Sequence, residues 1–248
     1  MMGQLLLRGM FAGLFAALLA FGFARVIGEP QVDRAIAFEE SHTAAEHQAH
    51  AANGAAAEAE EPELVSREVQ AGFGLLTGIA LFGTALGGLF ALAFAFASGR
   101  LLKFPPRTTA IVIAAIGFLA LYAVPYLKYP ANPPAVGAEE TIGYRTQLYF
   151  TMMVFSAAAL AVAITLGRAL ATSLGSWNAT VVGALAYIVL VTIAGYALPT
   201  INEVPNDFPA DLLWKFRIAS FAIQGILWAT IGLALGALVE RSKTRVAY

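Results

Sequence analysis

Residues 71–98 read AGFGLLTGIALFGTALGGLFALAFAFAS, and this stretch decides the fold class of the chain. It contains no charged residue, and a helix of this length can cross the hydrocarbon core of a bilayer, which is about 30 Å thick. A strand of a membrane barrel would alternate apolar and polar residues over about 10 positions, and this stretch does not. The sequence therefore predicts a transmembrane helix here.

Similar apolar runs recur along the chain, which is 59% hydrophobic and only 12% charged. A soluble domain carries roughly twice that share of charge. We predict an all-α polytopic membrane protein, with a bundle of about six transmembrane helices in a single membrane domain over residues 1–248. The expected spans are about 4–27, 71–98, 108–127, 147–168, 179–198 and 216–239. Arg8 resembles the charged start of a signal peptide, but the run after it is too long and lacks a clear cleavage site.

The distribution of Lys and Arg indicates the orientation. With six spans both termini share one side, which carries 8 basic residues and Glu240 as its only acid, whereas the other side carries 7 basic and 15 acidic residues. The difference in the number of Lys and Arg residues is too small to determine the orientation, but the compact clusters at 100–107 and 241–245 favour cytoplasmic termini. The long, acidic first loop is then expected in the periplasm or outside the cell.

This first loop, residues 28–70, is predicted to lie outside the membrane between spans 1 and 2. Pro30 and Asp33 suit the start of a short helix. Residues 51–61 are acidic and of low complexity, which is typical of a mobile tether.

All three histidines of the chain lie in this loop, at His42, His47 and His50. At 100° per residue on a helix, Glu39, His42, Glu46 and His50 fall within about 80° of one another, with His47 at the edge of that face. Two imidazoles and two carboxylates on one stripe suit Co, Ni or Zn, and the chain has no Cys to supply a thiolate. We predict that these five residues bind a metal ion. The alternative is a solvated polar tract that binds none.

The third loop, 128–145, and the fifth, 199–217, are rich in Pro and aromatic residues. Proline restricts the backbone and aromatic rings prefer the headgroup zone, so we expect these loops to form a rigid cap or vestibule. At least one carboxylate–guanidinium pair is predicted to link these segments and the start of the first loop. The vestibule candidates are Glu29, Asp33, Arg145, Glu203 and Arg217, with Arg25 and Asp207 as further pairing partners.

Small residues recur four positions apart in several spans. Such faces allow close contact of helices in lipid. We expect packing within the chain, and the alternative is a docking face for a partner helix. The pairs are Gly9 and Gly13, Gly74 and Gly78, Gly83 and Gly87, and Gly232 and Gly236.

The predicted membrane interior lacks Asp, Glu, Lys and His, which ion-coupled transporters usually place there. The sequence also has no nucleotide-binding loop, catalytic triad pattern or nucleic-acid signature. We therefore expect a protein that is not an enzyme, that needs no cofactor and that meets lipid rather than nucleic acid.

Several blocks in order along the chain resemble the CbtA family of predicted cobalt transporter subunits. They are Leu5-Leu-Leu-Arg8-Gly, Arg25-Val-Ile-Gly-Glu29-Pro with Asp33 and Glu39-Glu40, Ser66-Arg67, Lys128-Tyr-Pro-Ala-Asn132-Pro-Pro-Ala-Val-Gly137, Thr141-Ile-Gly-Tyr-Arg145, and Asn202-Glu203-Val-Pro with Phe208, Trp214 and Arg217. The resemblance implies a bacterial inner-membrane protein that takes part in cobalt supply for cobalamin synthesis. Co²⁺ would be its substrate, with Ni²⁺ as the alternative, and a small single-span CbtB protein its partner.

The sequence thus favours a subunit of a divalent cobalt uptake system, in which the His tract collects metal and the capping loops pass it on. The rival hypothesis is a non-transporting accessory or scaffold protein whose tract is a passive tether.

Overall fold

The computed structural model describes residues 2–52 and 65–246, and the side chains of residues 2–44 and 65–242. Five helical stretches in it are long and apolar enough to cross a membrane. They are Met2–Ala44, Arg67–Ala97, Pro106–Lys128, Glu139–Ala197 and Ala210–Ser242. The prediction of an all-α membrane bundle is confirmed.

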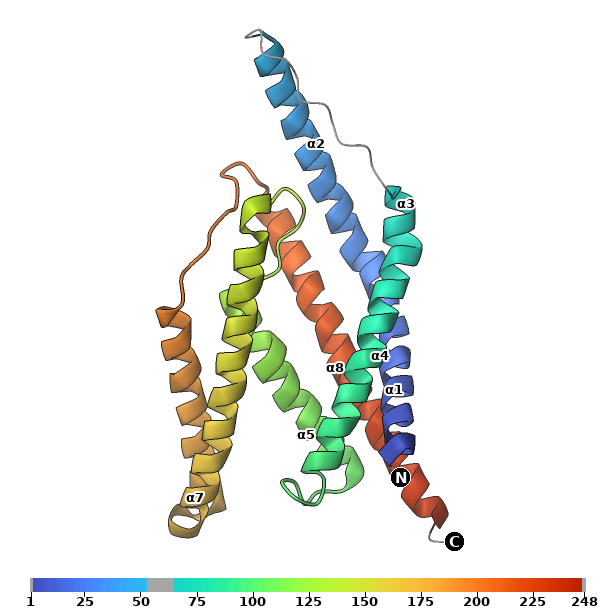
Figure 1. Ribbon diagram of the computed structural model, residues 1–248, viewed down its shortest axis with the longest axis vertical. Helices are drawn as coiled ribbons and strands as arrows, with labels where there is room; N and C mark the ends of the chain where they lie inside the picture. Colours follow the sequence, from blue (N-terminus) through green and yellow to red (C-terminus); the bar gives the residue numbers. More distant parts are fainter. Residues whose placement is uncertain (1, 53–64, 247–248) are drawn as a thin grey trace. The chain divides into compact units, whose positions relative to one another are not determined.

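The fourth stretch contains two of the six predicted spans. Helix α7 (Ile142–Ala197) is broken at Gly175, whose φ of 74° and ψ of 159° are not helical. Side chains rarely tolerate this backbone conformation, and glycine adopts it freely. Figure 1 shows the chain reversing direction here, so that the two arms of α7 run side by side. The predicted spans 147–168 and 179–198 are these two arms.

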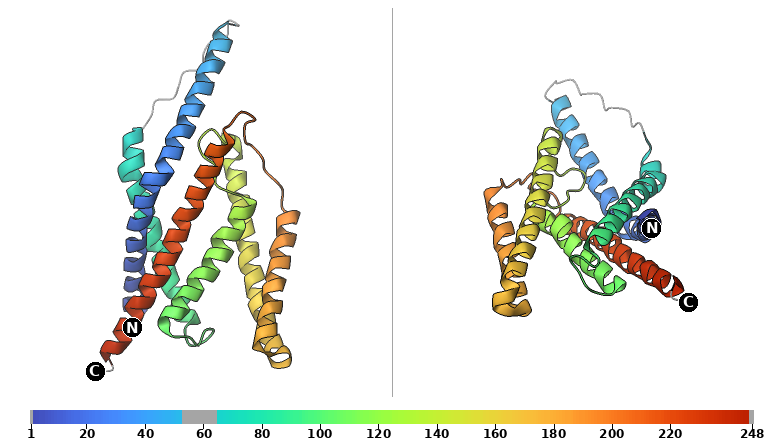
Figure 2. Two further views of the ribbon diagram at one scale, coloured as in Figure 1. Left: turned by 180° about the vertical axis from the view of Figure 1, so that it is seen from behind. Right: turned by 60° about the horizontal axis from the view of Figure 1, so that its bottom comes forward.

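Helix α1 (Met2–Phe23) runs through a π-helical turn, η1 (Ala24–Gly28), into α2 (Glu29–Ala52), as the blue helix of Figures 1 and 2 shows. Proline inside a helix lacks an N–H group and clashes with the carbonyl four residues earlier. That carbonyl belongs to Val26, within η1, so the wider turn accommodates Pro30 without ending the helix. The expected short helix that begins afresh at Pro30 was wrong, because the helix continues from span 1 and is long.

A second π turn has the same cause. Helix α5 (Pro106–Phe118) passes through η3 (Leu119–Ala123) into α6 (Val124–Lys128). Pro125 lies near the start of α6, and the carbonyl four residues earlier, that of Leu121, again lies inside the π turn. The third span is therefore one continuous helical stretch despite its proline.

The remaining elements complete the chain. Helix α3 (Arg67–Val69) leads through the π turn η2 (Gln70–Gly74) into α4 (Leu75–Ala97), a 3-10 turn η4 (Glu139–Thr141) precedes α7, and α8 (Ala210–Val246) follows the fifth loop. Pro209 immediately precedes the first residue of α8. Helix α7 ends at Ala197, because Leu198 precedes Pro199 and has an extended backbone.

By its contacts the chain divides into two compact units. The first comprises residues 1–115, 132–136 and 205–248, and the second comprises 116–131 and 137–204. The prediction of one membrane domain over 1–248 remains a prediction, and each unit is described by itself.

In the first unit, α1 packs along α4 with almost no side chain between the two backbones. A Cβ atom built on Gly13 would lie 2.0 Å from the carbonyl oxygen of Gly83, and one on Gly87 would lie 2.1 Å from that of Gly9. On α8, a Cβ on Gly232 or Gly236 would similarly press against α5. Packing within the chain, the first of the two hypotheses for these residues, is confirmed for these six glycines.

In the second unit, the two arms of α7 pack against each other and against η3. The buried hydroxyls of Ser156 and Tyr187, one from each arm, form a hydrogen bond of 2.8 Å. Exposed Trp177 and Tyr196 lie near opposite ends of the second arm, 19 residues or about 28 Å apart at 1.5 Å per residue. Aromatic rings prefer the two interfaces of a bilayer, so this spacing fits a membrane-crossing helix.

Candidate functional site

The predicted metal-binding residues all lie on one helix, α2, which extends through the histidine tract to Ala52. The prediction that these residues share one face requires a helix, and the backbone is helical throughout the tract. The side chains of Glu39 and His42 are exposed. Glu46, His47 and His50 lie outside the residues whose side chains are described. Their part in a metal site stays a prediction.

His42 is joined to a residue far away in the sequence. Its Nε2 atom forms a short hydrogen bond with the Oδ2 atom of Asp207, in the loop between α7 and α8. The two side chains remain 45% and 56% exposed. An imidazole and a carboxylate from two separate segments of the first unit therefore meet at a place that water and ions can reach.

Aromatic rings hold this pair in place. The Phe38 ring lies one turn before His42 on α2, and the two ring centroids are 4.3 Å apart. On its other side Phe38 meets Phe208 edge-to-face at 5.0 Å. Phe208 is buried, so the residue next to Asp207 is anchored to the same helix that carries His42. Edge-to-face aromatic pairs contribute about 0.5–1.5 kcal/mol beyond their burial.

A second cluster lies where η1 meets α2. Glu29 is only 7% exposed, and its carboxylate forms a short ion pair with the Arg67 guanidinium. The same guanidinium binds Asp33, one turn further along α2, at 2.9 and 3.1 Å. One cation thus joins two carboxylates and fixes the start of α3 to the start of α2. The vestibule candidates Glu29 and Asp33 are brought together by this arginine, and not by Arg25, Arg145 or Arg217.

A third cluster, in the second unit, centres on Glu203 of the fifth loop. Its Oε2 atom accepts hydrogen bonds from the backbone N–H of Ala138 at 3.1 Å and the hydroxyl of Thr141 at 2.9 Å. The Nε atom of Arg145 lies 3.5 Å from the same oxygen. The expected carboxylate–guanidinium pair between the third and fifth loops is therefore present, as Arg145 with Glu203.

Glycine is required beside this cluster. Gly137 has a φ of 108°, and a Cβ atom there would lie 2.2 Å from a guanidinium nitrogen of Arg145. Further contacts between the two loops lie nearby: the Tyr129 hydroxyl donates to the carbonyl of Pro199 at 2.7 Å, and Lys128 donates to Thr200 at 3.3 Å. Burial, and then the neighbouring Tyr144, raise the pKa of Tyr129, so its hydroxyl stays neutral and available as a donor. The expected contact between the third and fifth loops is confirmed, while their role as a vestibule stays a prediction.

The last vestibule candidate, Arg217, lies in the first unit near the start of α8. Its guanidinium donates to the side-chain oxygen of Asn132 at 2.9 Å. Within the first unit, Asn132 thus attaches its part of the third loop to α8.

Sequence reasoning missed Arg67 and Asn132 as anchoring residues, and it did not join His42 to Asp207 or Phe38 to Phe208. These partners lie between 34 and 170 residues apart, and charge or spacing alone does not pair them. A signal existed for three of them, since Arg67, Asn132 and Phe208 belong to the sequence blocks that carry the family resemblance.

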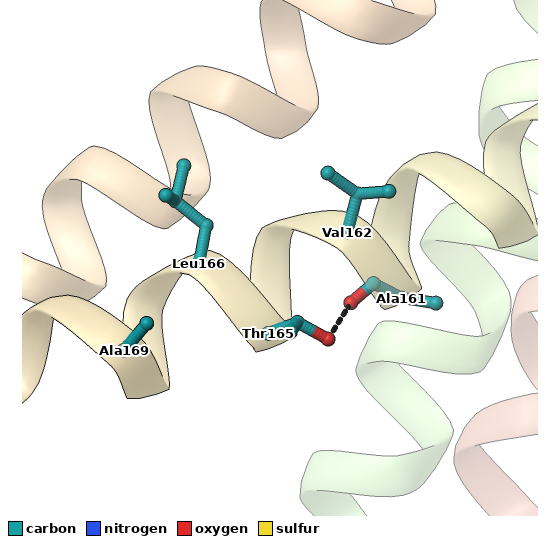
Figure 3. A pocket seen from close by; sticks show the side chains of 5 residues that line it. All are labelled: Ala161, Val162, Thr165, Leu166 and Ala169. Atoms are coloured by element: carbon teal, nitrogen blue, oxygen red, sulfur yellow. Dashed lines mark hydrogen bonds between the residues drawn. The ribbon is translucent and has the colours of Figure 1, made fainter.

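Among the described side chains, no group of three or more His, Asp or Glu is arranged to hold a metal ion. The hollow of about 480 Å³ on the first arm of α7 offers no ligand either (Figure 3). Ala161, Val162, Leu166 and Ala169 line it with hydrocarbon, and the Thr165 hydroxyl donates to the carbonyl of Ala161 at 2.7 Å. A cation would find no free polar group there.

The chain matches one family model, described as "Probable cobalt transporter subunit (CbtA)", over residues 2–240. It belongs to the CbtA family. No curated protein and no solved structure matches it. The CbtA match covers every cluster described above and the whole histidine tract. Together with the apolar helices, it makes this chain a membrane protein and a probable cobalt transporter subunit, and a subunit has a partner in a complex.

Proposed function

We propose that this CbtA protein works in the uptake of divalent cobalt across a bacterial inner membrane, and that it supplies cobalamin synthesis. In this proposal α2 collects the metal ion outside the membrane through Glu39, His42, Glu46, His47 and His50. The clustered third and fifth loops then guide the ion toward the helices. The CbtA family description supports the substrate. Nickel is the alternative ion.

One observation supports the proposal: the histidine tract lies on a continuous helical extension of a transmembrane helix. The helix runs without a break from α1 through η1 into α2, so the ligand-bearing residues are held at fixed spacing. A stripe of imidazoles and carboxylates on such a helix is suited to Co²⁺ or Ni²⁺. A flexible loop would have to be ordered at a cost of about 1–2 kcal/mol per residue before it could bind.

The protein is a subunit, so the transport path need not lie within this chain alone. The transmembrane arms lack Asp, Glu, Lys and His in their central parts, which is unusual for an ion path. A small single-span CbtB-type partner is the proposed second subunit. Cobalt accumulation should be measured in cells that carry the gene alone, with its partner, and with neither. Uptake that needs both genes supports the proposal, and uptake unaffected by removing this gene overturns it.

The orientation has a separate test. Both termini are proposed to lie in the cytoplasm, because basic residues cluster at 100–107 and 241–245. A reporter that works only in the cytoplasm should be active when fused after Tyr248. Activity of a periplasmic reporter at that position would place α2 in the cytoplasm and would contradict its role as an external collector.

The alternative function is that of an accessory or scaffold protein that binds no metal. The described side chains, which include Glu39 and His42 but not the other three residues of the tract, hold no group of three metal ligands. Metal accumulation separates the two functions, since a scaffold whose tract is a passive tether would keep full uptake when the three histidines are replaced by alanine.

A further inference from the structure

The hydrogen bond between His42 and Asp207 joins two of the side-chain types that bind late first-row divalent ions. His42 belongs to the proposed collecting tract on α2, and Asp207 belongs to the fifth loop, 165 residues later in the chain. The metal prediction from the sequence included only residues of the tract. The structure adds a carboxylate that periodicity on one helix could not supply.

The geometry of the pair suits a shared ion. In a coordination shell with metal–nitrogen and metal–oxygen distances of about 2.0–2.2 Å, neighbouring ligand atoms lie about 3 Å apart, which is also the length of a hydrogen bond. An ion can therefore take the place of the hydrogen between Nε2 and Oδ2 with small movements of the two side chains. The imidazole then binds the metal through the Nε2 lone pair, with its single N–H proton on Nδ1. Both side chains are about half exposed, so a hydrated ion can reach them.

The surroundings keep the two ligands near each other before any ion arrives. Phe38 packs on the imidazole on one side and against Phe208 on the other, and Phe208 is the residue next to Asp207. This aromatic link does not depend on the proton or on a metal. The loop therefore stays close to α2 when the hydrogen bond is exchanged for metal coordination.

We propose that His42 and Asp207 are two ligands of one transfer site for a divalent cation, at which an ion collected on α2 passes to the loop between α7 and α8. This inference rests on the proposed function and names where the tract delivers its ion. Two protein ligands with the remaining positions filled by water give weak binding, and a site that must release its ion again requires weak binding. Glu39, one turn before His42 on α2, is the nearest further carboxylate on that helix.

The test uses the purified full-length protein and titration with CoCl₂, followed by calorimetry and by the visible absorption of bound Co²⁺. Asp207→Asn keeps a hydrogen-bond acceptor for His42 but is a poor ligand, whereas Asp207→His removes the charge and keeps a metal ligand. We expect at least about tenfold weaker binding for Asp207→Asn and for His42→Ala, because even outer partners of metal ligands contribute about 10–100-fold. Asp207→His should bind as tightly as the unchanged protein, with an altered absorption spectrum.

The matched control is Asp211→Asn, four residues further on, where an exposed carboxylate pairs with Lys215 at 3.1 Å instead of with a histidine. It should leave Co²⁺ affinity unchanged. The double variant His42→Ala with Asp207→Asn should lose less affinity than the product of the two single losses, because the two residues hold one ion together. Losses that simply multiply would mean that the two residues act at separate ions, and would overturn the inference.

Failure of this inference is distinct from failure of the proposed function. If Asp207→Asn binds Co²⁺ like the unchanged protein while replacement of all three histidines abolishes binding, the transfer site is wrong and the collecting tract stands. If replacement of all three histidines also leaves binding unchanged, the collecting tract itself is wrong.

Discussion

Helices α1 and α2 are consecutive parts of one helical stretch, but different kinds of contact fix them in place. Helix α1 packs against α4, whereas α2, which carries the histidine tract, contacts the fifth loop. Between α1 and α4, glycine faces glycine and the backbones touch, so shape alone determines the contact. Along α2, most of the described side chains near His42 are exposed, and a few polar and aromatic contacts attach the helix to the fifth loop. Stability and function are therefore separable along this helix, and substitutions should affect one or the other.

The largest expected effect on stability is at the glycine interface. Gly13→Leu puts a side chain where even a Cβ atom would lie 2.0 Å from the Gly83 carbonyl oxygen, so α1 and α4 must separate. Overpacking typically costs about 1–3 kcal/mol, and this change should exceed that range and reduce the yield of folded protein. Thermal unfolding in detergent measures the loss.

Gly78→Leu, on the partner helix α4, is the control, because nothing lies within 4 Å of a Cβ atom built there. It should leave the unfolding temperature unchanged or raise it slightly, since glycine lowers helix stability by about 1 kcal/mol relative to good helix formers. Equal losses for both variants would mean that the glycines do not define the interface.

The next largest effect is expected at Arg67, which lies at the border between the two regions. Arg67→Ala leaves the buried Glu29 carboxylate without its partner. Removing one member of a buried pair costs about 3–5 kcal/mol, and the 29% exposure of the Arg67 side chain should lower this to about 2 kcal/mol. The free energy of unfolding should change little for Arg34→Ala, an exposed arginine of α2 that serves as control.

A smaller effect is expected at Glu203, which joins the third and fifth loops. Glu203→Gln keeps an acceptor for Ala138 and Thr141 but loses the charge that attracts Arg145. The pair is partly exposed, so a loss of about 1 kcal/mol is expected in thermal unfolding. Glu139→Gln, at an exposed carboxylate of the third loop, provides the comparison and should cost less. Similar losses would show that Glu203 contributes no more than any loop carboxylate.

The smallest effect on stability is expected at the transfer pair. Asp207→Asn should change the free energy of unfolding by less than about 1 kcal/mol, because exposed ion pairs contribute little. The same variant should nevertheless lower cobalt uptake at limiting metal. A loss of stability as large as that of Arg67→Ala would make the pair a structural contact and remove the contrast between the two regions.

Much of this organisation follows from the sequence. The transmembrane spans could be predicted from apolar runs that are long enough to cross a bilayer, and the packed helix faces from Gly-x-x-x-Gly spacing. Both are local patterns of the sequence. The π turns were not predicted, since proline was expected to start a helix at Pro30, whereas a wider turn lets the helix pass through it. Partners such as Arg67 with Glu29 and His42 with Asp207 were not predicted either. They depend on where separate segments meet, and charge patterns do not determine that.

The most direct test of the central claim is cobalt accumulation in cells whose protein carries alanine in place of His42, His47 and His50. A tract that collects ions for a separate path matters only when ions are scarce. We therefore expect reduced uptake at limiting cobalt and nearly normal uptake when cobalt is abundant, with the amount of membrane-inserted protein unchanged. Unchanged uptake at limiting cobalt would contradict the account and reduce the tract to a tether.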